Sequence, residues 1–146
     1  MLIKYKDNFR WQKVPIKKYK AKGNTFKSIV KQSILGENIN DLNFCTRYFE
    51  IKKDGYSSLE YHEHPHVVVV IRGTGIAIIG TELLSIKPFD CLYIPPNTYH
   101  QLQTKGEESL GFLCIVDKVR DKPKLLNDEE ITTLKKHTKI GKVIKF

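Results

Sequence analysis

The sequence predicts an all-β domain, a sandwich or barrel of short strands, that ends in one short helix. Three observations support this prediction. Between about residues 25 and 117, segments rich in β-branched and aromatic residues alternate with turn residues at intervals of about 8–12 positions. No segment before residue 127 has helical periodicity of useful length. The chain has 146 residues, which suits a single domain of roughly 100–200 residues with a core of its own.

The clearest strand covers residues 44–51, where two sets of side chains alternate with a period of two. One set is Phe44, Thr46, Tyr48 and Glu50, and the other is Cys45, Arg47, Phe49 and Ile51. Turn residues follow this strand. Later strands are expected at residues 59–71, 76–79, 83–86, 91–94 and 110–116, the first four of them followed closely by glycine or proline.

The two ends of the chain differ from this β-rich middle. Residues 1–42 are expected to form a basic arm with strands, and residues 118–146 a basic extension that contains the helix. Asn127 can cap a helix from Asp128 to about His137, because its side chain can accept from the first free amides. Three acids in the first turn and a basic last turn suit the helix dipole. The extension is too short to be a separate DNA-reading domain.

The net charge of +9 is distributed unevenly. Residues 1–35 carry ten Lys/Arg and one acidic residue, a net charge of +9. Residues 36–117 carry six Lys/Arg and eleven acidic residues, a net charge of −5. Residues 118–146 carry nine Lys/Arg and four acidic residues, a net charge of +5. Nucleic-acid-binding domains usually gather basic residues on one face beside elements that contact bases. This distribution argues against a nucleic-acid partner, although lysines interleaved with aromatic residues such as Tyr5 and Trp11 leave a polyanion-binding role open.

The sequence does not support a membrane or secreted class. The longest apolar run is five residues, Val67 to Ile71, whereas a membrane-spanning helix needs about 20. Lysines near the start are followed by no apolar stretch, so no secretory signal is expected. The three cysteines form no C-x-x-C pair, and we expect Cys91 and Cys114 to be buried as small apolar residues. A cytoplasmic protein without a membrane partner is expected.

Four of the five histidines occupy two places in the β-rich middle. His62, His64 and His66 alternate, so on a strand all three side chains point to one face. Pro65 indicates a bend, which shortens the span between the outer two imidazoles. His100 follows a Pro-Pro-Asn turn from which a strand can return beside the first. Because neutral imidazoles suit Zn, Cu, Fe and Ni, the pattern predicts a metal site.

Two segments carry a family resemblance. A glycine, an H-x-H pair and a second glycine lie at Gly55, His62–His64 and Gly73, and a proline and a histidine lie at Pro95 and His100. Through these residues the chain resembles the cupin superfamily, whose two motifs are G-x5-H-x-H-x3,4-E-x6-G and G-x5-P-x-G-x2-H-x3-N. Departures from the second motif leave its histidine in place: Phe89, Asn97 and Thr104 replace two glycines and an asparagine.

The resemblance implies a double-stranded β-helix, the jelly-roll barrel of the cupins, with its core at residues 43–117 of a single domain spanning 1–146. It also implies one divalent transition metal (Fe, Mn, Ni, Cu or Zn) in the mouth of the barrel. The implied ligands are His62, His64, His66 and His100. His66 stands at the glutamate position of the first motif, so the site resembles the four-histidine variant of the family.

The expected function is that of a metal-dependent enzyme acting on a small organic substrate, by dioxygenase-like or by isomerase or lyase chemistry. Neutral histidines leave a divalent metal its full charge, so an anionic ligand can bind without opposing charge. The alternative is a non-catalytic small-molecule or metal-binding module, which a shared fold does not distinguish from an enzyme. No general acid or base is assigned, and the candidate pocket residues are Tyr48, Tyr93, Tyr99 and Gln101.

Residues Val67 to Ile71 are apolar on both faces of their strand. A strand that faced water on one side would alternate between apolar and polar residues. We therefore expect the N-terminal segment or another subunit to cover the outer face. The cupin resemblance implies a homodimer packed through such strands, and we expect residues 1–30 to contribute to it.

Overall fold

The computed structural model describes residues 1–146 and contains eleven strands and one helix. This confirms the all-β class and the single short helix at the C-terminal end. The elements in chain order are β1 (Lys17–Lys18), β2 (Lys27–Leu35), β3 (Phe44–Tyr56), β4 (Glu60–Tyr61), β5 (His66–Arg72), β6 (Gly75–Ile79), β7 (Glu82–Ile86), β8 (Cys91–Ile94), β9 (His100–Thr104), β10 (Leu110–Asp117), β11 (Lys124–Leu125) and α1 (Asp128–Lys135).

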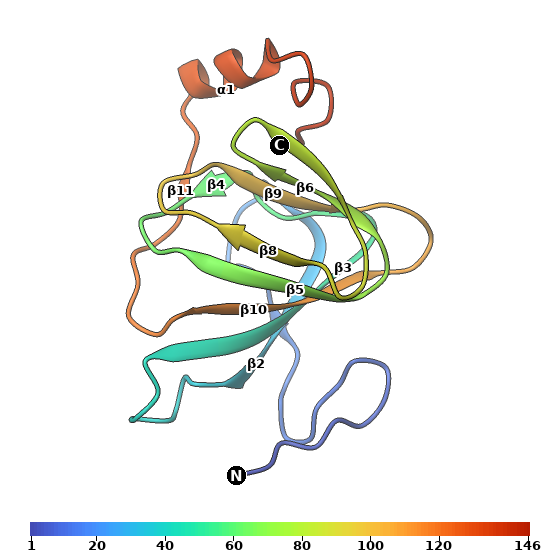
Figure 1. The fold of residues 1–146 in the computed structure, drawn as a ribbon, viewed down its shortest axis with the longest axis vertical. Helices are drawn as coiled ribbons and strands as arrows, with labels where there is room; N and C mark the ends of the chain where they lie inside the picture. The colour runs from blue at the N-terminus through green and yellow to red at the C-terminus, as the bar shows by residue number, and fades with distance from the viewer.

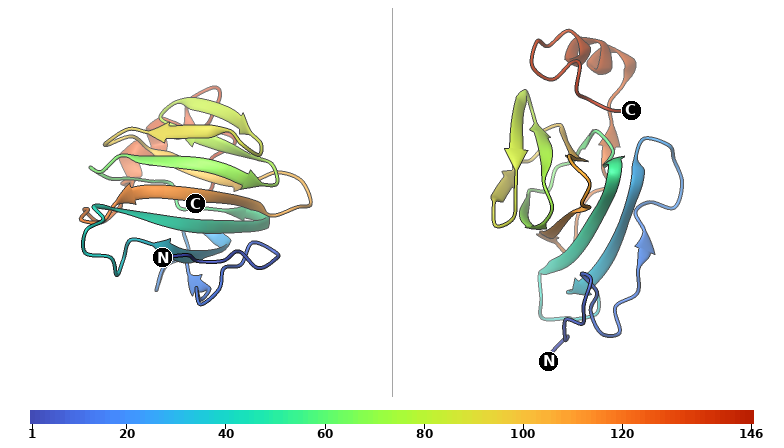
Figure 2. Two further views of the ribbon diagram at one scale, coloured as in Figure 1. Left: turned by 60° about the horizontal axis from the view of Figure 1, so that its bottom comes forward. Right: turned by 90° about the vertical axis from the view of Figure 1, so that its right-hand side faces the viewer.

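The strands pair antiparallel throughout and form one sheet that curls into two facing layers (Figures 1 and 2). One layer has the order β1-β2-β3-β10-β5-β8, and the other has the order β7-β6-β9-β4-β11. β3 belongs to both layers because it is long. Most of it pairs with β2 and β10, whereas Tyr56 at its end pairs with Gln103 of β9. The jelly-roll barrel implied by the family resemblance is confirmed.

Apolar side chains on the inner faces of the strands fill much of the space between the layers. β3 and β10 supply adjacent rows, and the rings of Phe49 and Phe112, which are partners in the register, stack with centroids 5.5 Å apart. The buried residues of these two rows include Cys45, Phe49, Ile51, Phe112, Cys114 and Val116. The expected burial of Cys114 is therefore confirmed.

Cys91 does not follow the expectation, because its side chain is exposed. It begins β8, the strand at the end of its layer, and pairs with Val69 of β5. Val68 and Val70, the neighbours of Val69, are fully buried, so the row that holds Val69 and Cys91 faces outward. In a strand of four residues, period-two patterning alone does not determine which row faces the core.

The N-terminal arm covers the outer face of β3. The Phe9 ring stacks on Tyr48 at 5.9 Å, and the Trp11 ring contacts Tyr48 at 5.1 Å, both measured between ring centroids. Next along the same face, Glu50 is buried and accepts from Arg10 at 3.0 Å and from Arg72 at 3.3 Å. These contacts account for the burial of two polar side chains on the outside of the barrel.

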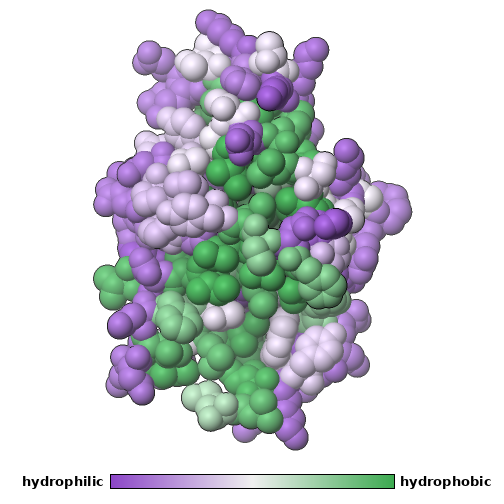
Figure 3. Space-filling view, in the orientation of Figure 1, coloured by the Kyte–Doolittle hydropathy of each residue, from purple (hydrophilic) through white to green (hydrophobic).

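The outer face of β5 is not covered within one chain. Val67 is 38% exposed, and Tyr93, its partner on β8, is 61% exposed. Figure 3 shows apolar side chains gathered on the side of the molecule where β5, β8 and β10 lie toward the viewer. The N-terminal arm therefore covers β3 rather than β5, and an apolar surface remains open to solvent.

The C-terminal extension packs against the end of the barrel (Figure 1). Asn127 caps α1 as predicted, and with Glu130 it forms a capping box in which each side chain bonds to the other residue's amide. Leu134 and Ile140 join a small core with Leu59 of the barrel. The helix is shorter at its C-terminal end than expected. No helix has the length and apolar character needed to cross a membrane.

Candidate metal centre

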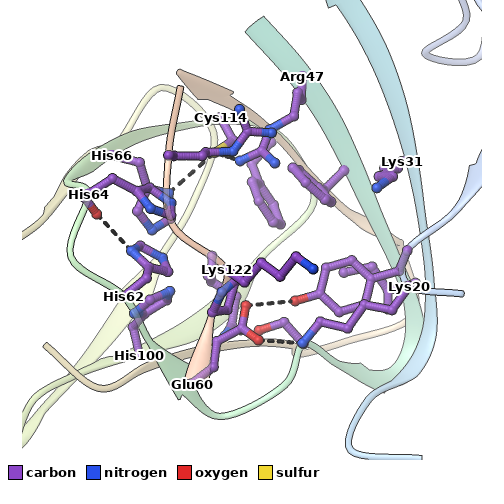
Figure 4. Close-up of a pocket in the computed structure, with 18 of the residues that line it drawn as sticks. Lys20, Lys31, Arg47, Glu60, His62, His64, His66, His100, Cys114 and Lys122 are labelled. Atoms are coloured by element: carbon purple, nitrogen blue, oxygen red, sulfur yellow. Dashed lines mark hydrogen bonds and ion pairs between the residues drawn. The ribbon is translucent and has the colours of Figure 1, made fainter. Parts of the chain in front are cut away.

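A cavity of about 490 Å³ opens between the two layers of the barrel. Twenty residues line it, and they come from the N-terminal arm, both layers and the segment after β10. Figure 4 shows the histidines gathered on one side of the cavity, with Lys20 and Lys31 on the other side. The cavity thus has a nitrogen-donor end and a cationic end.

Three histidines converge at the donor end. One ligand atom from each of His62, His66 and His100 lies within 4.8 Å of those of the other two. His66 begins β5 and His100 begins β9, whereas His62 follows β4. The amide of Asn97 donates to the carbonyl of His62 at 2.7 Å, which holds the turn before β9 beside the segment that carries His62.

The backbone near the histidines has the two features expected from the sequence, a turn at Asn97 and a bend at Pro65. Asn97 has φ +54, the left-handed conformation that asparagine tolerates well. The chain bends between β4 and β5, where Pro65 interrupts the ladder, so His62 and His64 lie in a connection and only His66 lies in a strand. Because of the bend, the ligand atoms of His62 and His66 lie within 4.8 Å of each other. A flat strand would place these two residues farther apart.

Each of the three imidazoles directs its Nδ1 away from the other two. Nδ1 of His62 donates to the carbonyl of His64 at 2.7 Å, and Nδ1 of His100 donates to the carbonyl of Thr98 at 2.8 Å. These bonds fix the tautomer and leave Nε2 with the lone pair. Metal-binding histidines in proteins are oriented by such hydrogen bonds from the second ring nitrogen.

His66 completes the set. Its Nδ1 is 3.2 Å from Sγ of Cys114, and its Nε2 is buried without a hydrogen-bond partner. A buried nitrogen without a partner costs free energy unless something binds to it. The three residues therefore fit a divalent transition metal, for which neutral imidazole is a suitable ligand.

Burial keeps these imidazoles neutral. It lowers the pKa of His66 to about 2 and that of His100 to about 4, and the neighbouring histidines add to the effect in both cases. The pKa of His62 is lowered by the same two causes, burial first and His64 second. At neutral pH all three side chains are therefore in the form that binds a metal.

His64 lies beside this group and is held differently. Its ring stacks on that of His62, with centroids 3.7 Å apart and planes 4° apart. Its Nδ1 is 2.6 Å from Oδ1 of Asp121, whose carboxylate also accepts from the amides of Glu63 and His64. The amide of Glu63 is the main reason that the pKa of Asp121 lies far below its usual range. The assignment of His64 as a fourth ligand remains a prediction.

The cationic end of the cavity was not anticipated from the sequence. Five basic side chains that line the cavity make no ion pair, and two of them, Lys118 and Arg120, donate to backbone carbonyls instead. The remaining three, Lys31, Arg47 and Lys122, are named here the cation cluster. Arg47 could have been found, because it lies in the same period-two row as Cys45 and Phe49, where a charged residue is unexpected.

Lys20 and Tyr19 form another wall of the cavity, around a buried carboxylate. Lys20 forms an ion pair with Glu60, and the Tyr19 hydroxyl donates to Glu60 at 3.3 Å. Burial, and next the charge of Glu60, raise the pKa of Tyr19, so its hydroxyl stays protonated. Glu60 is the register partner of His100, which places this carboxylate beside the three histidines.

None of the four polar residues expected in the pocket lines the cavity. Tyr48 and Tyr93 lie on outward rows of β3 and β8, and Tyr99 donates to Glu130 of α1 at 2.6 Å. Gln101 donates to backbone carbonyls of Ser57 and the C-terminal extension. The period-two pattern defines two rows for each strand, and the choice of inward row depends on packing that the pattern does not contain.

Comparisons with known proteins agree with this architecture. The cupin domain family matches residues 47–116. A curated relative from Rhodospirillum rubrum, named 1-methylthio-D-xylulose 5-phosphate methylsulfurylase, is 35% identical over 132 residues, which is 90% of this chain and 83% of the relative.

Two solved structures are also similar. A cupin 2 conserved barrel domain protein from Rhodopseudomonas palustris is 32% identical over the whole of both chains, with a TM-score of 0.93. A cupin-2 domain protein from Rhodospirillum rubrum is 35% identical, with a TM-score of 0.81. The match covers 89% of this chain and 86% of that protein's chain. The matched motif segment, these relatives and the barrel with its converging histidines lead to one conclusion: the chain belongs to the cupin superfamily.

Proposed function

We propose that this cupin is a metal-dependent enzyme that acts on a small phosphorylated sugar. The observation that carries the proposal is the cavity, in which three metal-competent imidazoles lie at one end and the unpaired cation cluster extends from beside them, since Arg47 and His66 both contact Cys114. A substrate suited to it has an anionic group at one end and a group that can meet a metal at the other. A phosphorylated sugar has both.

The name of the Rhodospirillum rubrum relative narrows the substrate class. It describes a five-carbon keto sugar with a methylthio group at one end and a phosphate at the other. We propose that this chain takes a substrate of the same class. Because that name refers to the methylsulfur group, we favour non-oxygenase chemistry at this end of the substrate over dioxygen insertion.

Four histidines are proposed to hold the metal: His62, His66 and His100 as the main ligands, and His64 as the fourth. A bound divalent cation would supply Lewis-acid polarisation of a substrate oxygen. The chain's own residues provide the remaining features. Backbone carbonyls and Cys114 orient the imidazoles, and Tyr19 and Lys20 line the same cavity, where they hold the Glu60 carboxylate.

The test uses the full chain loaded separately with Fe, Mn, Ni, Cu or Zn and titrated with 1-methylthio-D-xylulose 5-phosphate in a calorimeter. We expect saturable binding, and with at least one metal a change in the methylthio proton signal by NMR over time. Absence of binding with every metal would overturn the proposal. Binding without turnover for every metal would support the alternative, a non-catalytic small-molecule-binding module.

A further inference from the structure

The basic side chains that line the cavity fall into two groups. Lys20 is paired with Glu60, Lys118 donates to the carbonyl of Ile39 at 2.7 Å, and Arg120 donates to two backbone carbonyls. The cation cluster of Lys31, Arg47 and Lys122 has no such partners among carboxylates or carbonyls. Positive charge at this wall of the cavity is therefore left uncompensated by the protein.

Arg47 is the most constrained member of the cluster. Its Cζ lies 5.1 Å from the centroid of the Phe49 ring, and its Nη2 donates to Sγ of Cys114 at 3.2 Å. Its Nε is buried without a hydrogen-bond partner. The guanidinium is thus oriented by an aromatic face and a sulfur atom while at least one of its donors remains free. A buried donor of this kind costs free energy unless an acceptor occupies the site.

Lys31 lies on the neighbouring strand, where the register places it opposite Phe49 and diagonal to Arg47. Burial lowers the pKa of Lys31, and the charge of Arg47 is the next largest cause. Two cations that destabilise each other are a favourable arrangement for an anion that contacts both. Figure 4 shows Lys122, from the segment after β10, extending over the same space.

We propose that the cation cluster is a phosphate clamp: Arg47 and Lys31 bind the phosphate of the substrate from the sheet, and Lys122 covers it from the opposite side. This rests on the proposed function and adds which residues select a phosphorylated substrate. A phosphate monoester carries about −1.5 to −2 charges at pH 7, with three acceptor oxygens. It matches a planar guanidinium and two ammonium groups better than a singly charged carboxylate does.

The clamp lies close to the metal site, which limits the orientation of the substrate. Sγ of Cys114 is 3.2 Å from both Arg47 Nη2 and His66 Nδ1, so one sulfur atom connects the two ends. The phosphate is therefore held on the Arg47 side, and the other end of the sugar is directed toward the histidines. An analogue without its phosphate loses this orientation.

The experiment compares phosphorylated and unphosphorylated probes on the metal-loaded full chain. Inorganic phosphate, D-xylulose 5-phosphate and D-xylulose are titrated in a calorimeter against wild type, Lys31→Met, Arg47→Met and Arg47→Lys. Lys52→Gln serves as a charge-matched control, because Lys52 is an exposed lysine of β3 outside the cavity. Metal content and far-UV circular dichroism are measured for each variant.

We expect wild type to bind D-xylulose 5-phosphate at least about tenfold more tightly than D-xylulose. Each Met variant should lose about 10- to 100-fold in affinity for the phosphorylated probe, as expected for losing a hydrogen bond to a charged group. Arg47→Lys should recover part of that loss, and the control should lose less than about twofold. Metal content should be unchanged in all variants.

Equal affinity of wild type for both sugars, or losses in the Met variants no larger than that of Lys52→Gln, would overturn the clamp. If Arg47→Met does not fold, Lys31→Met alone decides the question. Failure of the proposed function gives a different pattern. In that case phosphate and D-xylulose 5-phosphate still bind through Lys31 and Arg47, while 1-methylthio-D-xylulose 5-phosphate is neither bound more tightly nor converted.

Discussion

Arginines lie against the two faces of β3 in opposite situations. On the outer face, the Glu50 carboxylate accepts from Arg10, Arg72 and the Tyr48 hydroxyl at 3.0–3.3 Å, beneath the N-terminal arm. On the inner face, three residues earlier, Arg47 has no carboxylate partner. The outer cluster is complete without a ligand and therefore stabilises the fold. The inner one is incomplete, which is the condition of a binding site.

The histidines also lie inside the barrel, and the largest effect expected of any substitution is the loss of metal affinity when one of them is removed. His62→Ala should lower metal affinity by more than about 100-fold, because it removes a ligand whose tautomer and orientation are already fixed. His137→Ala, at a distance from the cavity, should change nothing. Elemental analysis after dialysis against a weak chelator measures both. Stoichiometric metal in His62→Ala would contradict the assignment.

His64 can be tested in the same way. We expect His64→Ala to lose most metal affinity too. A loss equal to that of His62→Ala would identify His64 as a fourth ligand. A loss of about tenfold would instead be typical of a residue that supports the ligands through a hydrogen bond or a stack.

The open part of the outer face gives the next prediction. We propose that a second copy of the chain covers β5 and β8, since the N-terminal arm does not. Light scattering at micromolar concentration should give twice the chain mass of 16.9 kDa. Val67→Asp should give a monomer, whereas Leu83→Asp, also at a position 38% exposed but on β7, should leave the dimer intact. A monomeric wild type would contradict this proposal.

The closed part of the outer face predicts a loss of stability. Glu50→Gln removes the charge that both arginines share, and the free energy of unfolding should fall by about 2–3 kcal/mol. Urea denaturation measures the change. Metal content should be unaffected, since the cluster is on the far side of the sheet from the cavity. An unchanged urea midpoint would show that the N-terminal arm is held by its aromatic contacts alone.

The smallest expected effect on stability belongs to the inner face. Arg47→Met breaks no ion pair and places an apolar side chain against Phe49, so the free energy of unfolding should change by no more than about 1 kcal/mol in either direction. The same urea experiment applies. A loss as large as that of Glu50→Gln would mean that Arg47 is part of the structural framework.

Local sequence signals predicted the parts of the fold that depend on local chemistry. Asn127 caps the helix as expected, the alternation along residues 44–51 appears as β3, and Pro65 marks a bend that brings His62 near His66. In each case the residues of one short segment determine its local structure. The resemblance to cupins supplied the barrel topology, which spacing alone left open between a sandwich and a barrel.

Features that depend on tertiary packing were missed. Tyr48 lies in a clear period-two strand, yet the aromatic residues of the N-terminal arm that cover its row, Phe9 and Trp11, lie 39 and 37 positions earlier. Lys31 and Lys122 come from segments far apart in the sequence, and nothing local indicates that they share a cavity with Arg47. Such sites become visible only when unpaired charges are counted in three dimensions.

The residues that line the cavity come from two parts of the chain, the segment that matches the cupin family and the flanks on either side of it. The segment that matches the cupin family, residues 47–116, contains all four histidines, Arg47 and Cys114. Lys20, Lys31 and Lys122 lie outside it, in the flanks. If the proposed clamp is correct, exchanging the flanks between two cupins should change phosphate binding through Lys31 and Lys122, while the four histidines and Arg47 stay in place.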